Sequence, residues 1–347
     1  MAQEMAMQEL APEILVHVFE ALSSATDIVN LSLTCRYFHT LLPSSQKLVL
    51  FYNAIDQTMG PADEIIQLLT SNDNQLLHIK RTPPLSYTLL TQIAQIGRVG
   101  QRFVNLYPTI KWAGDRSANR RSLNKDEARR LRRAVYRFWM YSQAFYNSSS
   151  YRSLRSEVAL YERLQLLRSW STSDLHDFED FRGILEHLVA TELCPTDGDV
   201  FSRHPEESRY GMHAWHRSGR QVVDLGSMFP DTFHTHRRED CVADSNKLSI
   251  QELRHKHMQG WGSDLDSFYL VQAFLKLTPV QLLWLFDHAV SKADVEQYVE
   301  KQTNDICFLE SGSSLFQDWV TVLHQRGGDV QQVREAIWDG VGGIAVD

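Results

Sequence analysis

The chain has 347 residues, 43% of them hydrophobic, which is enough to bury a sizeable core as one large domain or two modest ones. Its formal charge of −8 at pH 7 disfavours a general nucleic-acid binder, because contacts to phosphates need a surplus of lysine and arginine on one surface. The four cysteines form no Cys-x-x-Cys pair, which disfavours a disulfide framework and a thiolate zinc site. We therefore expect a reduced protein of the cytoplasm or nucleus.

The N-terminal residues 1–9 contain no basic run and no long apolar run, so we expect a tail and not a secretory signal. The most apolar stretch, residues 268–290, is interrupted by Lys276, Pro279, Asp287 and two glutamines. Such a segment is not expected to span a lipid bilayer. The sequence therefore predicts no membrane segment.

Residues 10–42 predict three short helices with two apolar faces. A polar turn at residues 23–27 separates the two apolar runs. A unit below roughly 40 residues usually needs a disulfide, a metal or a partner to hold a core. We therefore expect these helices to lean on another polypeptide. The apolar residues are Leu10, Ile14, Leu15, Val18, Phe19 and Leu22 in the first run and Ile28, Leu31, Cys35, Phe38, Leu41 and Leu42 in the second.

The order of residues in this segment resembles the F-box family. The family motif begins Leu-Pro-x-Glu-(Ile/Leu)-Leu, continues with an aliphatic-Phe pair and an acidic turn, and ends with a Cys-Arg-x-aromatic helix. This chain departs from it at Ala11, where the family usually has proline, and Pro12 comes one place later. The matching residues are Leu10, Glu13, Ile14, Leu15, Val18, Phe19, Asp27, Cys35, Arg36, Tyr37 and Phe38.

The resemblance implies that residues 10–45 bind the Skp-family adaptor of an SCF ubiquitin ligase and, through it, a cullin. Residues 46–347 would then form a helical domain that holds an unidentified target protein. The chain itself would be a non-catalytic subunit without a cofactor. The residues that the resemblance implies for adaptor binding, directly or as support, are Leu10, Pro12, Glu13, Ile14, Leu15, Val18, Phe19, Leu22, Leu31, Cys35 and Phe38.

Beyond residue 45 the sequence predicts an irregular multi-helix domain, so the expected fold class is mainly α. Pro61 followed by two acids predicts a helix start, and Gly97 and Gly100 are expected to end a helix that begins near Leu85. No repeat of about 20 to 45 residues is visible, which disfavours leucine-rich and propeller domains. Further helices are expected at 157–169, 173–193, 248–277, 279–290, 294–302, 315–325 and 330–338.

The helix with the strongest sequence signal covers residues 125–146. Asn124 and Glu127 have the spacing of a capping box. The helical wheel places the apolar residues on one side and Arg129, Arg133 and Arg137 on the other, which is either a face for an acidic partner or a solvated face. The segment also resembles a helix of large helical F-box proteins of filamentous fungi.

A long irregular insert is expected at about residues 194–247, because glycines and prolines interrupt its periodicity. It contains five histidines and two cysteines but no His-Glu-x-x-His or deaminase pattern, so no metal site is expected. The insert's candidate ligands are His204, His213, His216, His234, His236 and Cys241.

Cys35 and His39, in the N-terminal helices, lie four residues apart, which is a spacing that a nucleophile and its base can have. The Cys35 thiol lies on the apolar face of its helix, so we expect it to be buried and unreactive.

Three alternatives stay open at this point. The F-box-like segment could tether the adaptor to another assembly outside a ubiquitin ligase. The chain could instead be a metal-dependent enzyme built on the histidine-rich insert. The N-terminal helices could also pack into the chain's own core, which would leave no surface for a partner.

Overall fold

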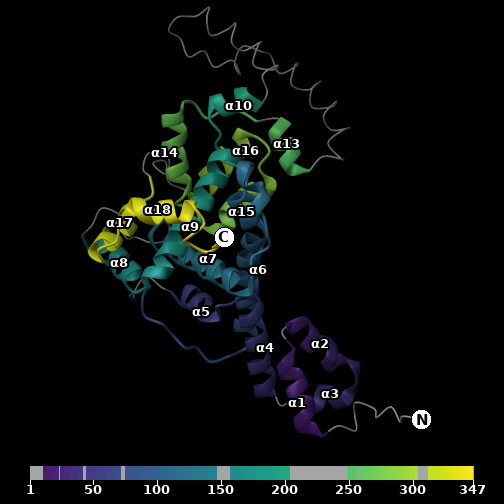
Figure 1. The fold of residues 1–347 in the computed structure, drawn as a ribbon. Coiled ribbons are helices and arrows are strands. Elements are labelled where there is room, and N and C mark those ends of the chain that lie inside the picture. Colours follow the sequence, from purple (N-terminus) through teal and green to yellow (C-terminus); the bar gives the residue numbers. More distant parts are fainter. Residues whose placement is uncertain are drawn as a thin grey trace, which may run out of the picture. The chain divides into compact units, whose positions relative to one another are not determined.

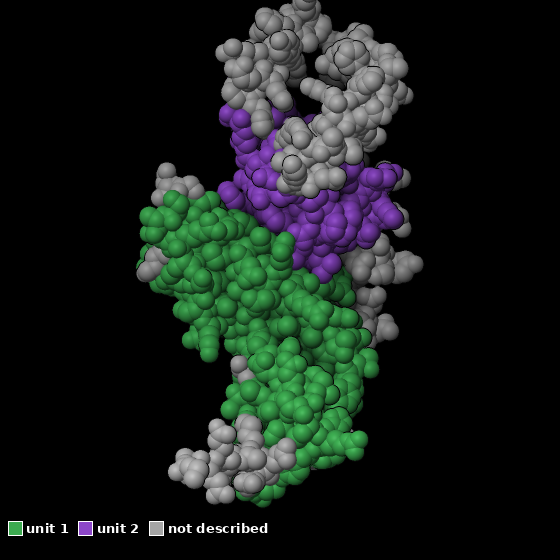
Figure 2. All heavy atoms as spheres, turned by 90° about the vertical axis from the view of Figure 1, so that its right-hand side faces the viewer, with its two compact units in different colours: residues 1–184, 314–347 green, residues 185–313 purple. Residues whose placement is uncertain are grey.

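The computed structural model describes residues 11–22, 24–41, 44–71, 75–146, 157–203, 249–256, 258–303 and 312–346. The regular elements in these ranges are helices, which confirms the predicted mainly α fold (Figure 1). None of these helices is both long enough and apolar enough to cross a bilayer. The chain divides into two compact units, coloured separately in Figure 2: unit 1 holds residues 1–184 and 314–347, and unit 2 holds residues 185–313.

Unit 1 begins with three short helices that share a core with the helix that follows them. Pro12 occupies the first turn of α1, where its fixed φ suits a helix and its missing N–H is not needed. Leu15 and Phe19, four residues apart, place their side chains in the core, and Phe19 meets Phe38 edge to face with 6.3 Å between the ring centres. These helices are α1 (Pro12–Ala21), α2 (Ala25–Thr34), α3 (Arg36–Leu41) and α4 (Ser44–Met59).

The next helices of unit 1 confirm one predicted helix and correct another. The helix α7 has the predicted bounds, and Asn124 and Glu127 exchange backbone-to-side-chain hydrogen bonds of 2.8 and 2.9 Å as the capping box requires. The predicted end of the preceding helix at Gly97 and Gly100 is wrong, because α6 continues through both glycines to Lys111. The bounds are α5 (Ala62–Thr70), α6 (Tyr87–Lys111), the 3-10 turn η2 (Gly114–Asn119) and α7 (Lys125–Tyr146).

The two glycines of α6 are positions of close helix contact. A Cβ at Gly97 would lie 2.6 Å from the Cβ of Met59 on α4, and a Cβ at Gly100 would lie 2.5 Å from the Tyr136 hydroxyl on α7. No real side chain tolerates such distances. The glycines therefore let α4 and α7 approach α6, and helix termination is not their role.

The remaining helices of unit 1 come from two distant parts of the sequence. The helix α9 starts one residue before the predicted position, with Ser171 and Asp174 capping it through their side chains. Trp319 is fully buried and donates its indole N–H to the Leu175 carbonyl at 2.9 Å, which ties α17 to α9. The bounds are α8 (Glu157–Arg168), α9 (Thr172–Leu188), α17 (Leu315–Gln325) and α18 (Val330–Trp338).

Unit 2 contains short helices, and one predicted helix is divided there. The single helix expected at 248–277 is wrong, because Gly262 has φ of +99° and Ser263 starts a new helix with a capping box. The predicted start at Thr278 is correct, and Thr278 and Gln281 form a second capping box. The bounds are the π turn η3 (Val189–Leu193), α10 (Asp197–Arg203), α13 (Ile250–Lys256), α14 (Asp264–Phe274), α15 (Pro279–His288) and α16 (Lys292–Thr303).

Candidate adaptor-docking surface

The core of the N-terminal helices is closed by α4 of the same chain. Leu15, Phe19 and Phe38 are at most 5% exposed, and they pack in one cluster with Leu50 and Ala54 of α4. The expectation that these side chains stay uncovered until a partner arrives is therefore wrong. Sequence reasoning missed the role of α4 because it ended the segment at residue 45, although an apolar pattern resumes at Lys47.

The other predicted partner residues are divided between exposed and half-buried positions. Pro12, Glu13 and Ile14 at the start of α1 are exposed, and half of the Ile14 surface is accessible. Such positions are free to contact another protein. Leu10 lies outside the described residues. The half-buried positions are Val18, Leu22, Leu31 and Cys35.

Three exposed apolar side chains lie on α2 and α3 outside the predicted set. Val29 and Leu33, four residues apart on α2, are 39% and 69% exposed, and Tyr37 on α3 is 38% exposed. Ile28 and Leu31 occupy the inner face of α2, so Val29 and Leu33 form a second apolar stripe that faces solvent. The sequence feature that indicates this exposed stripe is the presence of two apolar stripes on the same helix, because only one of them can face the core. We define the outer apolar surface as Ile14, Val29, Leu33 and Tyr37.

The pair of Cys35 and His39 has no nucleophile-base geometry among the contacts that the structure describes. Cys35 joins α2 to α3 in an extended conformation, and its carbonyl accepts the His39 amide at 3.1 Å, which is the first hydrogen bond of α3. The thiol is partly buried. Cys35 therefore supports the helix junction.

The arginines of α7 lie against carboxylates of this chain. Arg129 contacts Asp56 on α4 at 3.0 Å, and Arg133 contacts Asp174 on α9 at 3.2 Å. Both arginines keep about a third of their side-chain surface accessible, at 37% and 34%. The predicted acidic partner is thus already supplied within the chain. The sequence pattern does not reveal these pairs, because the paired acids lie more than 40 residues away along the chain.

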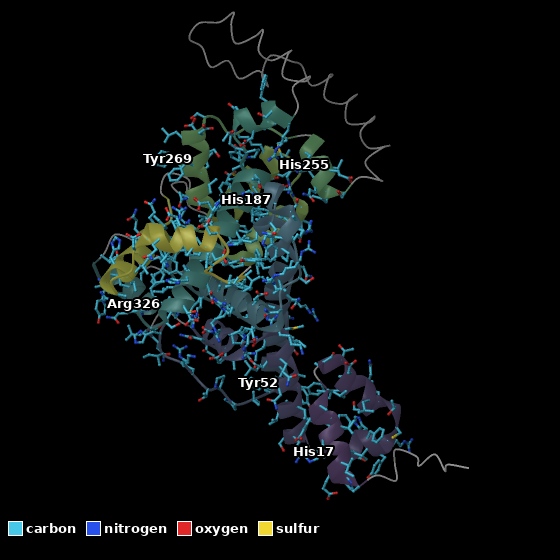
Figure 3. The ribbon with its side chains drawn as sticks, in the orientation of Figure 1. His17, Tyr52, His187, His255, Tyr269 and Arg326 are labelled. Atoms are coloured by element: carbon cyan, nitrogen blue, oxygen red, sulfur yellow. The ribbon has the colours of Figure 1, made fainter. Side chains whose placement is uncertain are left out.

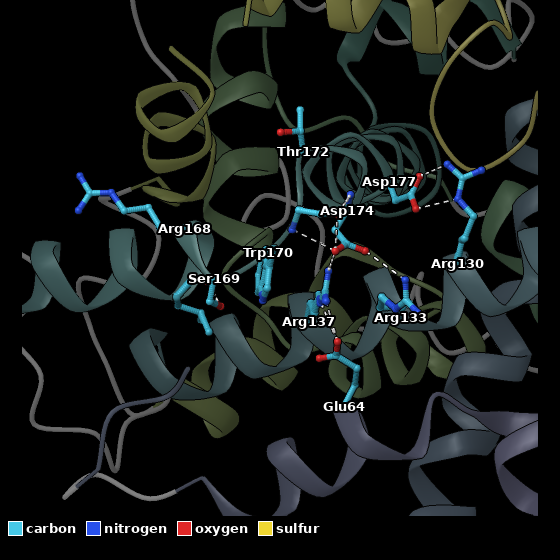
Figure 4. Close-up of polar contacts among 12 residues, drawn as sticks. Glu64, Arg130, Arg133, Arg137, Arg168, Ser169, Trp170, Thr172, Asp174 and Asp177 are labelled. Atoms are coloured by element: carbon cyan, nitrogen blue, oxygen red, sulfur yellow. Dashed lines mark hydrogen bonds and ion pairs between the residues drawn. The ribbon is translucent and has the colours of Figure 1, made fainter. Parts of the chain in front are cut away.

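The prediction that Arg137 shares an exposed face with Arg129 and Arg133 is wrong, because Arg137 lies in the interior. Its guanidinium contacts Glu64 on α5 at 2.7 Å and Asp174 on α9 at 3.0 Å, and it stacks on Trp170 at 5.1 Å (Figure 4). Burial raises the pKa of Asp174, but hydrogen bonds from Ser171 and the charge of Arg137 outweigh it and bring that pKa to about 2. This network joins three helices of unit 1.

A groove of about 480 Å³ lies beside the N-terminal helices, between the end of α1, α4 and α7. Tyr52, labelled in Figure 3, lines it, and burial together with Asp56 raises the Tyr52 pKa. Arg129 and Arg133 also line it, but both already contact carboxylates. The groove therefore offers no free cation to an anionic ligand.

The prediction of an irregular insert from residue 194 is wrong at its start, because residues 197–203 form α10. His204, His213, His216, His234, His236 and Cys241 lie outside the described residues. Within the described ranges, no group of three or more His, Cys, Asp or Glu side chains is arranged to hold a metal ion.

Comparison with known proteins identifies the N-terminal helices. A family model described as F-box-like matches residues 8–46. No curated protein and no solved structure shows a significant match to the chain. The chain therefore carries an F-box-like domain, and the matched segment covers α1–α3 and the first residues of α4.

Proposed function

We propose that this chain is the substrate-recognition subunit of an SCF-type ubiquitin ligase. The helices α1–α3 would bind a Skp-family adaptor, and the helical remainder would hold a target protein. The observation that carries the proposal is the outer apolar surface, which stays exposed although α4 has filled the core behind it. Four exposed apolar side chains on so small a domain favour an interaction site there.

The contribution of such a subunit is positional. By holding a target near a ubiquitin-loaded enzyme, it raises the effective concentration of a target lysine, and this requires no catalytic residue in the chain itself. The adaptor would link the chain to a cullin in the cytoplasm or nucleus. The histidine-rich insert has no assigned role in this proposal.

The helix α4 connects the proposed docking surface to the rest of unit 1. Leu50 and Ala54, near its middle, belong to the F-box core. In its second half, Asp56 pairs with Arg129, and the Met59 carbonyl accepts a hydrogen bond from Tyr136 on α7. A continuous helix therefore passes from the F-box core into the helical domain, as a subunit that positions a target requires.

The test is co-purification of the full chain with a Skp-family adaptor. Leu33→Asp places a charge in the outer apolar surface without touching the core, and we expect the affinity for the adaptor to fall by at least about tenfold, as for an interface hot spot. The matched control is Asn30→Asp, which adds the same charge at an exposed position of the same helix. Equal adaptor yields from both variants, with both helical spectra unchanged, would count against the proposed surface.

A further inference from the structure

Residues 340–346 follow α18 and enter unit 1 as an irregular segment. Gly340 and Gly343 both have positive φ, and they turn the segment out of the helix. Ile344 and Ala345 are then enclosed, with 0% and 1% of their surfaces exposed. We define the tail slot as the side chains that contact this segment, together with their charge partners: Tyr107, Lys111, Arg121, Glu127, Arg130, Asp177 and Asp180.

The tail slot binds the backbone of the segment through side chains. Asp180 accepts the Ile344 amide at 2.9 Å, and Arg130 donates to the Gly343 carbonyl at 2.7 Å. Side chains on α7 and α9 thus take the place of the neighbouring strand that usually satisfies an extended backbone. Two further bonds come from Arg130, which donates to the Ile344 carbonyl at 3.4 Å, and from Arg121, which donates to the Val346 carbonyl at 2.9 Å.

The charges of the tail slot are paired without the help of the segment. Each cation contacts a carboxylate that also belongs to the slot, so removal of the segment leaves no lone buried charge. The slot is therefore preorganised to receive a peptide, and an empty slot keeps its ion pairs. The pairs are Lys111 with Asp180 at 2.8 Å, Arg121 with Glu127 at 2.7 Å and Arg130 with Asp177 at 2.5 Å.

The geometry limits which peptides fit. Gly343 has φ of +80°, and a Cβ there would lie 2.6 Å from Asp180 Oδ2, so the position requires glycine. The enclosed side chains that follow are one branched aliphatic residue and one small residue. Because the slot's cations and carboxylates are equal in number and already paired, an acidic or phosphorylated segment gains nothing there.

We propose that the tail slot is a peptide-recognition site, that residues 343–346 are its resident ligand, and that an uncharged partner segment with glycine, a branched aliphatic residue and alanine competes for it. A partner peptide binds only when the resident segment leaves. The resident segment therefore lowers the apparent affinity by the fraction of slots that it occupies. The proposal does not rest on adaptor docking, since every slot residue lies outside α1–α3.

The experiment uses the full chain and a labelled peptide of the sequence Gly-Gly-Ile-Ala-Val, which copies residues 342–346. Ile344→Asp drives the resident segment out, because an aspartate cannot stay in a fully buried aliphatic position. By fluorescence anisotropy we expect the variant to bind the peptide about tenfold or more tightly than the unaltered chain. The control peptide Gly-Gly-Asp-Ala-Val should bind neither protein.

A variant that keeps its helical circular-dichroism spectrum but binds no peptide, or binds both peptides equally, overturns the proposal. If the Ile344→Asp variant loses its helical spectrum, the test is amide hydrogen exchange of the unaltered chain, measured with each peptide in turn. An excess of the Ile peptide should then speed exchange of the amides of residues 344–346, while the Asp peptide leaves them unchanged. Identical exchange with the two peptides overturns the proposal as well.

Discussion

The helices α1–α3 and the helix α7 both contain residues for which the sequence offers an external partner, and the structure treats the two sets differently. On α7 the three arginines meet Asp56, Glu64 and Asp174 from other helices of unit 1. On α1 and α2, Ile14 of the predicted set is 50% exposed, and Val29 and Leu33, which lie outside that set, are 39% and 69% exposed. Charged side chains are long and can reach carboxylates far away in sequence, whereas an apolar stripe is covered only by another apolar surface. Exposed apolar residues are therefore the better indicator of an external partner here.

The largest effect should come from the inner side of the F-box. Phe19→Ala removes a ring that is 1% exposed and leaves a cavity, so the free energy of unfolding of α1–α3 should fall by about 3–5 kcal/mol. Ile14→Ala on the exposed side of the same helix should change it by about 0.5 kcal/mol or less. Native-state hydrogen exchange of the α1–α3 amides measures both. Similar losses for the two variants would show that the helix does not have the described inner and outer sides.

The next largest effect concerns the buried arginine of α7. Arg137→Ala leaves the Glu64 carboxylate buried without its cation, and this should cost about 3 kcal/mol of the free energy of unfolding. The matched variant Arg129→Ala removes a half-exposed ion pair and should cost less than about 1 kcal/mol. Urea unfolding followed by circular dichroism compares the two. Equal costs would mean that both arginines are solvated, as the sequence had suggested.

A smaller effect should appear in acid. The folded-state pKa of Asp174 is about 2, below its usual 3.8, so its ion pairs stabilise the fold fully above pH 4. This contribution, at most about 2 kcal/mol, should be lost as the pH falls from 4 toward 2. Asp174→Asn should lack this part of the pH dependence. The check is the difference in unfolding free energy between the two proteins, which should shrink across that pH range and not above it.

The sequence predicted those features whose causes are local. The bounds of α7 follow from the capping box of Asn124 and Glu127, and α15 starts where Thr278 caps it. The course of α6 through Gly97 and Gly100 depends on contacts with Met59 and Tyr136, which are 38 and 36 residues away. Sequence spacing carries no information about such contacts, so from sequence alone the two glycines predict a helix end.

For the docking site too, the sequence predicts the local pattern but not the contacts between distant residues. The F-box pattern is a local sequence order, and the family match to residues 8–46 agrees with it. The assignment of each side chain to the core or to the surface was not accessible from the pattern. Phe19 and Leu33 both fit a helical apolar run, and only the position of α4 decides that one is enclosed and the other exposed.

The participation of α4 in the F-box core has a consequence for anyone who would transplant this module. A fragment cut at residue 45 would leave behind Leu50 and Ala54, and with them one wall of its hydrophobic interior. A portable version has to extend through α4, to about Met59. The segment that matches the family model, residues 8–46, is therefore shorter than the segment that forms a closed hydrophobic core, which includes Leu50 and Ala54.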